Sequence, residues 1–328
     1  MAETNITGPL WGYEQRSRRL AGLWPTSVYV EFISTQRAIF GYGNSGVTYY
    51  SLTNLVSNTG VVASDTTGVG TARTGLAAAS YGGDKAIFGY GSNQAYVDNS
   101  YRKSMTNKVS NTGVVATDTT GVGTYRNYLA AASYGTDKAI FGYGNNEVDP
   151  SSISNLVSNT GVVANDTTGV GTARYQLAAA GYGTDKAIFG YGQPTPSTAQ
   201  SITNLVSNTG VVATNTAGVG TARKGLAAAG YGTDKAIFGY GDTFSSLESI
   251  TNLVSNTGVV ASNTTGVGTA RNYLAAARYG TDKAIFGYGQ MGSETSITNL
   301  VSNTGVVATD TTGVGTGRSG LAASSYGS

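Results

Sequence analysis

Six arginines recur along the chain, and each precedes a run of small residues. A guanidinium group presents several N–H donors in a rigid fork that suits carboxylate and phosphate, so six equivalent arginines around a channel would bind an anion. The alternative is structural, because each arginine could instead donate to backbone carbonyl groups where two repeats meet. A residue that recurs in every repeat usually serves the repeat itself, which favours the structural interpretation. The arginines are Arg73, Arg126, Arg174, Arg223, Arg271 and Arg318.

The acidic residues follow the same recurrence and form no catalytic set. One carboxylate per repeat is not a general acid–base pair, and a calcium ion needs six to eight oxygen ligands. The chain has no histidine and no cysteine, which excludes Ser-His-Asp and Cys-His nucleophiles, structural zinc and disulfide bonds. We therefore expect no metal site and no cofactor. The recurring positions are Asp84, Asp137, Asp185, Asp234 and Asp282 in turns, and Asp65, Asp118, Asp166 and Asp310, with Asn215 and Asn263 in two repeats.

A more promising binding signal lies in the segments whose length and sequence vary between repeats. Two of these segments are rich in tyrosine, and one adds basic residues. Tyrosine supplies a large contact area with few rotatable bonds, and arginine or lysine adds charged donors, a mixture found at protein and glycan contacts. We predict a binding surface there, with sequence drift tolerated in solvent as the alternative. The candidate residues are Tyr49, Tyr50, Tyr96, Tyr101, Arg102 and Lys103.

The variable segments lie within a repeat of otherwise constant length. The motif Lys-Ala-Ile-Phe-Gly-Tyr-Gly, at 138–144 in one copy, occurs six times with small changes, and so does a motif of the type Asn-Leu-Val-Ser-Asn-Thr-Gly. The first residue of the second motif precedes the next phenylalanine by 34 residues in all five complete cases. Length variation is therefore confined to one segment per repeat. The phenylalanines are Phe40, Phe88, Phe141, Phe189, Phe238 and Phe286.

Within one repeat the sequence predicts four short β-strands, separated by the turn signals of an all-β array. They cover residues 129–134, 138–143 and 153–159, and the fourth begins at 162. The second and fourth strands do not alternate between apolar and polar residues, as expected of strands that are covered on both faces. The small residues of the first strand suit a crowded position near an axis. Such repeats predict the four-stranded blades of a β-propeller.

The two ends of the repeat region complement each other. Residues 318–327 contain a first strand without its second strand, and residues 35–43 contain a second strand without its first. Pairing these strands completes a sixth unit and removes two exposed sheet edges. We therefore predict a six-bladed β-propeller over residues 35–328, closed by pairing the C-terminal strand with the N-terminal repeat strand.

Residues 1–34 are surplus to this ring and are predicted to form an N-terminal extension. They contain both tryptophans, Trp11 and Trp24, as candidate assembly contacts, and residues 28–33 would suit strand addition to a sheet edge. The extension would attach the ring to a larger assembly or cap it, and the sequence favours neither. The absence of a long apolar run or a signal-peptide pattern predicts a soluble protein without a membrane span. The formal charge of +2 argues against nucleic acid as a partner.

Residues 126–134, residues 137–144 and the Asn-Leu-Val-Ser-Asn-Thr-Gly stretch together resemble a kelch-type repeat, and the resemblance covers about residues 35–328. Kelch repeats share the small-residue strand, the glycine-containing second strand and the hairpin. This chain has Gly-Tyr-Gly where they carry paired glycines, and it lacks their tryptophan in the fourth strand. Repeats of the chromosome-condensation-regulator type are a weaker match. The nearly identical sequences of the repeats are also similar to repeat proteins of tailed phages that infect marine cyanobacteria. This resemblance implies a virion component.

These observations predict a non-enzymatic interaction module in a virion or another extracellular assembly. Its variable loops would bind other virion proteins, cell-surface proteins or glycans. The alternative is a carbohydrate-active enzyme, either a glycosidase or a lyase, because a lyase needs only tyrosine, arginine or lysine as its base. Sialidase-like chemistry would require acidic partners on different blades, and the sequence contains no asymmetric acidic set.

Overall fold

The computed structural model describes residues 35–93, 101–146 and 148–327, which belong to one compact unit spanning residues 34–328. This described part of the chain is all-β and contains no helix. Its strands form six three-stranded antiparallel sheets and one two-stranded hairpin. The predicted extension over residues 1–34, with Trp11 and Trp24, lies outside the described residues.

Each sheet is built from the same three segments of the repeat. In one copy, β8 (Ala130–Tyr134) pairs with β9 (Lys138–Gly142), which pairs in turn with β10 (Ser154–Val157). The register places Ile140 of β9 opposite Ala132 of β8. These strands agree with the first three predicted ones to within a few residues. The equivalent sheets are β5 (Ala77–Tyr81), β6 (Lys85–Gly89) and β7 (Thr106–Val109); β11 (Ala178–Tyr182), β12 (Lys186–Gly190) and β13 (Thr203–Val206); β14 (Ala227–Tyr231), β15 (Lys235–Gly239) and β16 (Thr251–Val254); β17 (Ala275–Tyr279), β18 (Lys283–Gly287) and β19 (Thr298–Val301); and β20 (Ala322–Tyr326), β1 (Arg37–Gly41) and β4 (Thr53–Val56).

The fourth predicted strand does not form a ladder, which corrects the expectation of four-stranded sheets. The segment after β10 pairs with it only through isolated bridges, one of them between Val157 and Val163. Between these bridges, the side chain of Asn155 supplies further hydrogen bonds to the segment that follows β10. Asn155 Nδ2 donates to the carbonyl oxygen of Ala164 at 3.0 Å and to Oδ1 of Asp166 at 2.8 Å. The chain therefore stays close to the sheet edge without adopting a regular strand.

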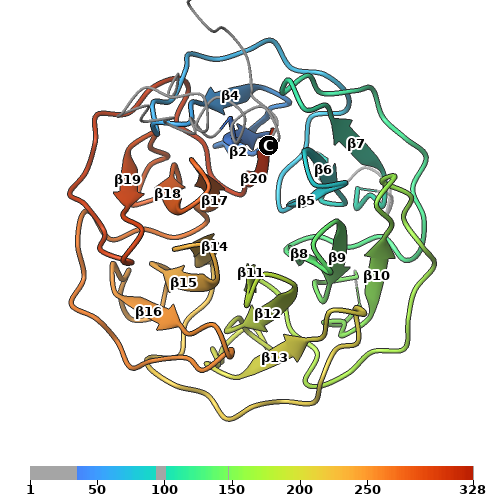
Figure 1. Cartoon of the computed structure of the whole chain (residues 1–328), viewed down its shortest axis with the longest axis vertical. Helices are drawn as coiled ribbons and strands as arrows, with labels where there is room; N and C mark the ends of the chain where they lie inside the picture. The colour runs from blue at the N-terminus through green and yellow to red at the C-terminus, as the bar shows by residue number, and fades with distance from the viewer. Residues whose placement is uncertain (1–34, 94–100, 147, 328) are drawn as a thin grey trace, which may run out of the picture. The chain divides into compact units, whose positions relative to one another are not determined.

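The place of each strand in its sheet explains its composition. The central strand β9 is buried at every residue after Lys138, because it is covered on both faces. This confirms the interpretation of its unbroken apolar run. The innermost strand β8 alternates between buried and partly buried residues. Its small side chains allow six such strands to approach one centre, around which Figure 1 shows the sheets arranged side by side.

Six hydrophobic clusters join each sheet to the next along the chain. In one of them, Ile140 and Tyr143 from the sheet of β9 pack with Phe189 and Val206 from the sheet of β12. Another cluster joins Phe40 of β1 to Ile285, Tyr288 and other residues in the sheet of β18. The first and last sheets therefore share a core of the same kind as consecutive sheets do.

The glycine of the Phe-Gly-Tyr motif makes room for an aromatic ring of the next sheet. A Cβ atom at Gly142 would lie 2.7 Å from Cζ of Phe189, closer than side chains can pack. Tyr143 follows with a positive φ of 64°, and its ring lies 5.1 Å from that of Phe189. Its hydroxyl donates to the carbonyl oxygen of Val170 at 3.1 Å. The motif is thus an intersheet packing device. The other glycine and phenylalanine pairs are Gly41 and Phe88, Gly89 and Phe141, Gly190 and Phe238, Gly239 and Phe286, and Gly287 and Phe40.

The last strand of the described chain pairs with the first. Strand β20 runs antiparallel to β1, with Tyr326 opposite Arg37 and Ala322 opposite Gly41, and β1 pairs with β4 on its other side. Segments 318–327 and 35–43 thus share one sheet, as their complementary strands predict. Figure 1 shows this sheet between those of β17–β19 and β5–β7.

The recurring arginines are buried next to these sheets, and their contacts confirm the structural interpretation. Arg73 is fully buried. Its Nε donates to the carbonyl oxygen of Tyr90 at 2.8 Å and its Nη1 to that of Thr71 at 3.0 Å. Its Nη2 donates to Oδ1 of Asn107 at 2.7 Å. The guanidinium group also lies 4.5 Å from the ring centroid of Tyr42 in the preceding sheet. Arg73 therefore links the segment before β5 to the end of β6 and to β7, and it packs against the sheet before it. The other recurring arginines share the contact with a tyrosine ring of the preceding sheet.

A carboxylate stands beside some of these arginines. Asp118 accepts hydrogen bonds from Thr71 and Asn107, and its Oδ1 lies 3.9 Å from Nη1 of Arg73. Burial raises the pKa of Asp118, but the hydrogen bonds from Thr71 and Asn107 and the charge of Arg73 outweigh burial and hold that pKa below its ordinary value. In two repeats an asparagine takes this place, and Arg174, next to Asn215, has no acidic neighbour among its interactions.

Replacing Asn215 by aspartate should increase the free energy of unfolding by about 1 kcal/mol at neutral pH, because buried Arg174 gains an opposite charge. The backbone N–H of Thr172 and Nδ2 of Asn204 already donate to Oδ1 of Asn215, at 3.1 and 3.0 Å. Since the equivalent Asp118 has a lowered pKa when folded, the gain is complete above the unfolded value of about 4. It is lost as the pH falls through the lower folded value.

Urea unfolding of Asn215→Asp at pH 7 and pH 3 measures this gain. The reverse substitution, Asp118→Asn, is the matched control and should lose a similar amount at pH 7. An increase in stability that persists undiminished at pH 3 would contradict the explanation, because a protonated carboxyl group carries no charge.

Candidate functional site

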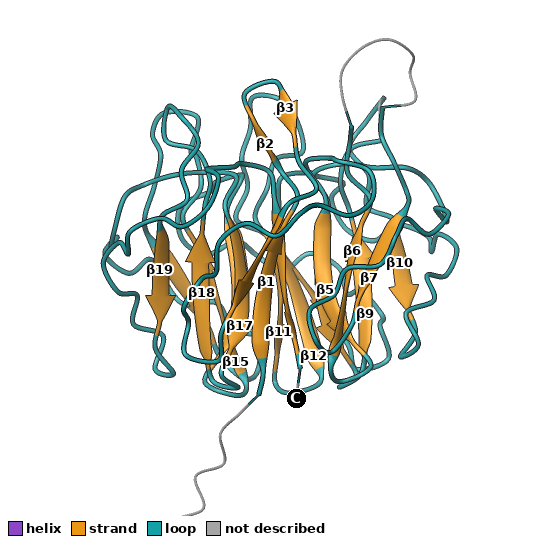
Figure 2. Ribbon diagram, turned by 90° about the horizontal axis from the view of Figure 1, so that it is seen from above, coloured by secondary structure: helices purple, strands orange, loops and turns teal. Residues whose placement is uncertain are grey.

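The variable segments are anchored at both ends by backbone hydrogen bonds. In the loop after β9, Asn145 forms an isolated bridge with Asn127, which precedes β8. Ser151 N donates to the carbonyl oxygen of Gly144 at 2.7 Å, which closes the base of the loop. Residues between these anchors can change in number without moving the sheet below. Figure 2 shows the loops that follow the central strands projecting from one end of the unit, and we call this end the loop face.

The first variable loop contains Tyr49 and Tyr50. It forms the two-stranded hairpin of β2 (Asn44–Ser45) and β3 (Thr48–Tyr49), which turns at Gly46 with a φ of 53°. Both tyrosines are half-buried. The backbone N–H of Gly46 lies 3.3 Å from Oε1 of Glu294 in the loop of the neighbouring sheet. The two tyrosines therefore belong to a loop that is held by its own pairing and by the loop beside it.

The predicted site residues of the second variable loop differ in how exposed they are. Arg102 is buried, forms a bridge with Ser92, and its Nε lies 3.3 Å from Oδ1 of Asn127 in the next sheet. Its guanidinium group lies 4.6 Å from the ring centroid of Tyr101. The structure thus brings Tyr101 and Arg102 together, with half-buried Lys103 next to them. Arg102 ties the loop to its neighbour and is little exposed. Tyr96 lies outside the described residues.

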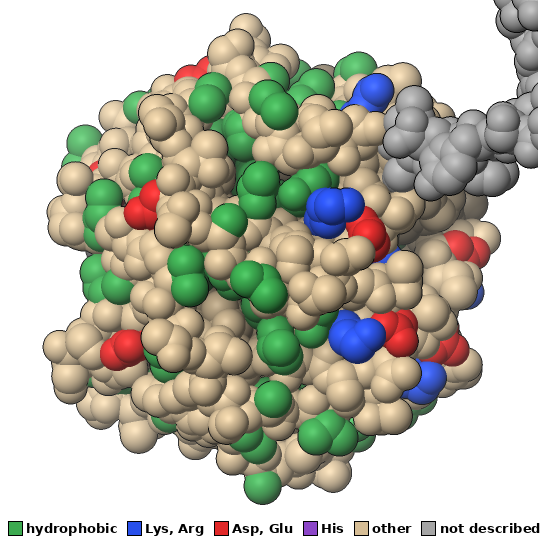
Figure 3. All heavy atoms as spheres, turned by 60° about the vertical axis from the view of Figure 1, so that its left-hand side comes forward, with side chains coloured by type: hydrophobic (Ala, Val, Ile, Leu, Met, Phe, Trp, Pro, Cys, Tyr) green, Lys and Arg blue, Asp and Glu red, His purple; other side chains and the backbone are tan. Residues whose placement is uncertain are grey.

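The tips of the variable loops carry apolar residues that the sequence analysis missed. Val47 is 86% exposed and Val148 is 85% exposed, and each belongs to a different loop. Phe244 and Met291, in two further loops, are also exposed. The ring of Phe244 lies 3.9 Å from Nζ of Lys224. The available signal was a large apolar residue within a segment where the repeat itself requires none. Figure 3 shows a surface on which hydrophobic side chains are spread among uncharged atoms and charged groups are few.

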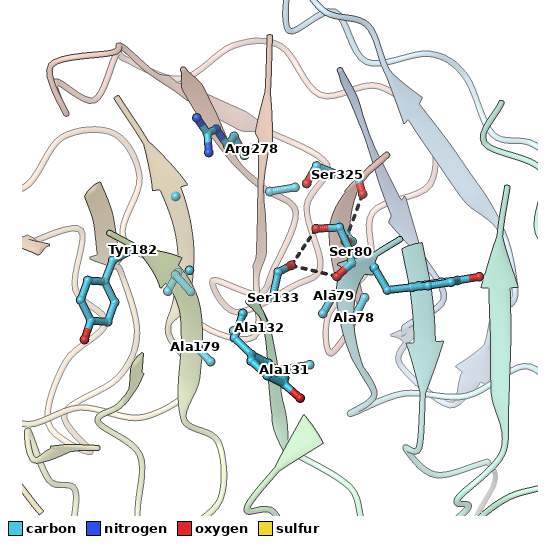
Figure 4. A pocket seen from close by; sticks show the side chains of 18 of the residues that line it. Ala78, Ala79, Ser80, Ala131, Ala132, Ser133, Ala179, Tyr182, Arg278 and Ser325 are labelled. Carbon is cyan, nitrogen blue, oxygen red and sulfur yellow. Dashed lines mark hydrogen bonds between the residues drawn. The ribbon is translucent and has the colours of Figure 1, made fainter. Parts of the chain in front are cut away.

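A cavity of about 230 Å³ lies between the innermost strands, opposite the loop face. It is lined by residues of these strands, such as Ala131, Ala132 and Ser133 of β8, and by residues of the turns that follow them, such as Thr136. Ser133 Oγ lies 2.7 Å from Oγ of Ser80, and the close-up of the cavity in Figure 4 includes both residues. The turn residues place the opening of the cavity at the end of the strands that is remote from the loop face.

At the loop face, the centre of the unit is filled by larger side chains. Tyr128 and Tyr273 contribute rings with centroids 5.9 Å apart, and Gln176 Nε2 donates to the hydroxyl of Tyr273 at 2.8 Å. Burial raises the pKa of the Tyr273 hydroxyl further above its ordinary value. The space left between these residues and the adjacent leucines is about 70 Å³. The two ends of the centre are therefore chemically different.

Among the described residues, no three acidic side chains come together as a metal site would require. The same part of the chain has no helix with the length and apolar character needed to cross a membrane. Comparison of the chain with models of known protein families and with curated proteins gave no match.

Proposed function

We propose that this unit is a six-bladed β-propeller, closed by the pairing of β20 with β1, and that it serves as a non-enzymatic interaction module. The proposed closure is supported by the register of β20 on β1 and by the hydrophobic cluster that joins Phe40 of β1 to Ile285 of β18. Each of the six sheets would be one blade, with the segment that follows its third strand as an irregular outer edge.

The observation that carries the functional proposal is the combination of a constant frame with variable loops that expose apolar residues. Four loops on different blades carry one exposed apolar side chain each. Isolated exposed apolar residues are common, but these occupy the freest segments of an otherwise repeated chain. The loops also begin from fixed anchors on a rigid scaffold, which is how binding surfaces are commonly built. The exposed side chains are Val47, Val148, Phe244 and Met291.

The chemistry of the loop face suits a protein or glycan partner. Exposed apolar groups and the half-buried tyrosines Tyr49, Tyr50 and Tyr101 favour contacts by packing and by single hydroxyl groups. The resemblance of the repeat to cyanophage proteins is the reason to propose a virion or another extracellular assembly, with other virion or cell-surface proteins or glycans as partners.

The alternative of a carbohydrate-active enzyme has less support. The lining of the central cavity includes serines, threonines, Lys186 and an arginine, but among the described residues it includes no aspartate or glutamate. A glycosidase needs two carboxyl groups flanking the bond to be cleaved. Turnover of a glycoside panel above that of a heat-denatured control would support the enzyme instead.

The test of the proposed function is a triple variant, Val47→Ser, Phe244→Ser and Met291→Ser, measured on an array of glycans and cell-surface proteins. We expect binding to fall at least tenfold, because packing contacts are lost, while the melting temperature changes by no more than a few degrees. The matched control replaces three other exposed apolar residues, the outer-turn valines Val61, Val114 and Val162, by serine. Equal losses in both triple variants, or no binding by the unmodified protein, would overturn the proposal.

A further inference from the structure

One position in the innermost strands breaks the repeat. The fourth residue of each of these strands lines the central cavity, and in five strands it is serine or glycine. In β17 it is Arg278, which is the only charged residue at this level among the described strands. A residue that differs from its five equivalents is not needed by the repeat itself, in contrast to the recurring arginines. The equivalent residues are Ser80, Ser133, Gly181, Gly230 and Ser325.

The neighbouring strand leaves space for this long side chain. A Cβ atom at Gly230, the equivalent position of β14, would lie 3.9 Å from Cδ of Arg278. The side chain therefore extends along the wall of the cavity over a residue that has no side chain. Figure 4 shows Arg278 together with Ser80, Ser133 and Ser325 on different strands around the same hollow. The lining of the cavity thus combines two cations, Arg278 and Lys186, with serine hydroxyl groups on other strands.

The guanidinium group of Arg278 has no hydrogen-bond or ion-pair partner within the described part of the chain, and its Nε is buried without one. Burial lowers the pKa of Arg278, whereas the charges of Asp282 and Asp234 raise it. Those two aspartates lie in turns and bond Lys283 and Lys235 at 2.9 and 3.1 Å. A donor withdrawn from water without a partner carries a free-energy penalty. The two terminal nitrogens are not buried in this way and have no partner among the described residues, so they are open to an anion that enters the cavity.

We propose that the central cavity binds a small oxyanion, a carboxylate or a phosphate monoester, through Arg278. The guanidinium fork would hold two anionic oxygens. The serines at the equivalent position of other strands line the same cavity. Of these, Ser133 donates to the carbonyl oxygen of Ser80 at 3.0 Å, and the two hydroxyl oxygens lie 2.7 Å apart. A volume of about 230 Å³ corresponds to roughly seven or eight water molecules at about 30 Å³ each, which is enough for phosphate or one acidic sugar. The anion would enter between the turns that follow the innermost strands. At the opposite end, Tyr128, Gln176 and Tyr273 fill the centre of the unit.

This site is independent of the proposed function of the loops. Its residues lie on the innermost strands and on the turns at the other end of the unit, so loop variants leave it intact. Failure of anion binding would therefore say nothing about the loop face, and failure of the loop variants would say nothing about Arg278.

The test is isothermal titration calorimetry of the full chain with inorganic phosphate and with glucuronate, at physiological salt. Glucose serves as the uncharged control ligand. We expect at least one of the two anions to bind with a stoichiometry near one and glucose not to bind. Arg278→Ser, which installs the residue found in three other strands, should raise the dissociation constant at least tenfold. The control Lys283→Ser, on the same hairpin but outside the cavity lining, should leave it within about twofold.

Two outcomes would overturn the proposal: neither anion releases or absorbs heat, or Arg278→Ser binds as tightly as the unmodified protein. The variant is expected to fold, because serine already occupies this position in β5, β8 and β20. Its melting temperature without ligand should equal or exceed that of the unmodified protein, and the anion should raise the melting temperature of the unmodified protein alone.

Discussion

A chain shortened to end at residue 318 should lose at least about 5 kcal/mol of its free energy of unfolding. The deletion removes strand β20 and with it the buried side chains of Leu321, Ala322 and Tyr326. It also leaves the hydrogen-bonding edge of β1 without a partner. Folded domains have only about 5 to 15 kcal/mol of stability in total, so the shortened chain is expected to melt tens of degrees lower or to lose its cooperative transition.

Differential scanning calorimetry and near-ultraviolet circular dichroism measure this effect. Adding a synthetic peptide of residues 319–328 should restore part of the lost stability, because a free strand can pair with the exposed edge. A peptide of the same composition in scrambled order is the control. If the shortened chain melts like the intact one, then β20 does not close the unit and the proposed propeller closure is wrong.

Replacing Arg73 by methionine should lower the free energy of unfolding by about 4 kcal/mol. Methionine keeps much of the packing against Tyr42 but removes the donors to the carbonyl oxygens of Tyr90 and Thr71 and to Oδ1 of Asn107. These acceptors lie in the interior, and the solvent that would replace the guanidinium group has little access to them. The effect should appear as a lower midpoint of urea unfolding with an unchanged slope.

The matched control is Lys85→Met, which removes a cation that is partly exposed and paired with Asp84 in a turn. Exposed ion pairs contribute little, so this change should alter stability by less than about 1 kcal/mol. Similar losses in the two variants would mean that burial of Arg73 does not determine its contribution. Binding assays on the Arg73→Met and Lys85→Met variants would show whether a loss of stability also reduces binding by the loop face.

The strands were predictable because the repeat gives the same local signal six times. Glycine turns and the constant spacing of 34 residues locate three strands per sheet, and the complementary ends anticipate the partner of β1. The fourth strand was predicted wrongly from its apolar start at Val162. Its attachment combines a few backbone bonds, such as that from Ala164 N to the carbonyl oxygen of Leu156, with a bond from the side-chain amide of Asn155 to the carbonyl oxygen of Ala164. A contact of that kind leaves no periodic pattern in the sequence.

The candidate sites were less predictable, because they depend on where side chains lie. The composition of the variable loop predicted Arg102 as a contact residue. In the structure, Arg102 is buried and hydrogen-bonded to Asn127 and Asn145, so it joins the loop to the neighbouring sheets. Arg278 was visible as a departure from Ser133 and its equivalents. Recognising its significance required the structure, which places the fourth residue of every innermost strand in the lining of the central cavity.

The pairing of β20 with β1 differs from every other strand pairing in how the chain finds it. The sheets are so alike in sequence that side chains alone cannot distinguish a strand's proper neighbour from the same strand of another repeat. Short covalent connections resolve this ambiguity within each hairpin, because they keep the correct partner at a high effective concentration. Arg37 and Tyr326 lie at opposite ends of the repeat region, so their strands gain that advantage only after the intervening sheets have assembled. Until then, β20 of a second molecule is an equally good partner, and the same bond that completes one ring is the one through which two chains would exchange strands.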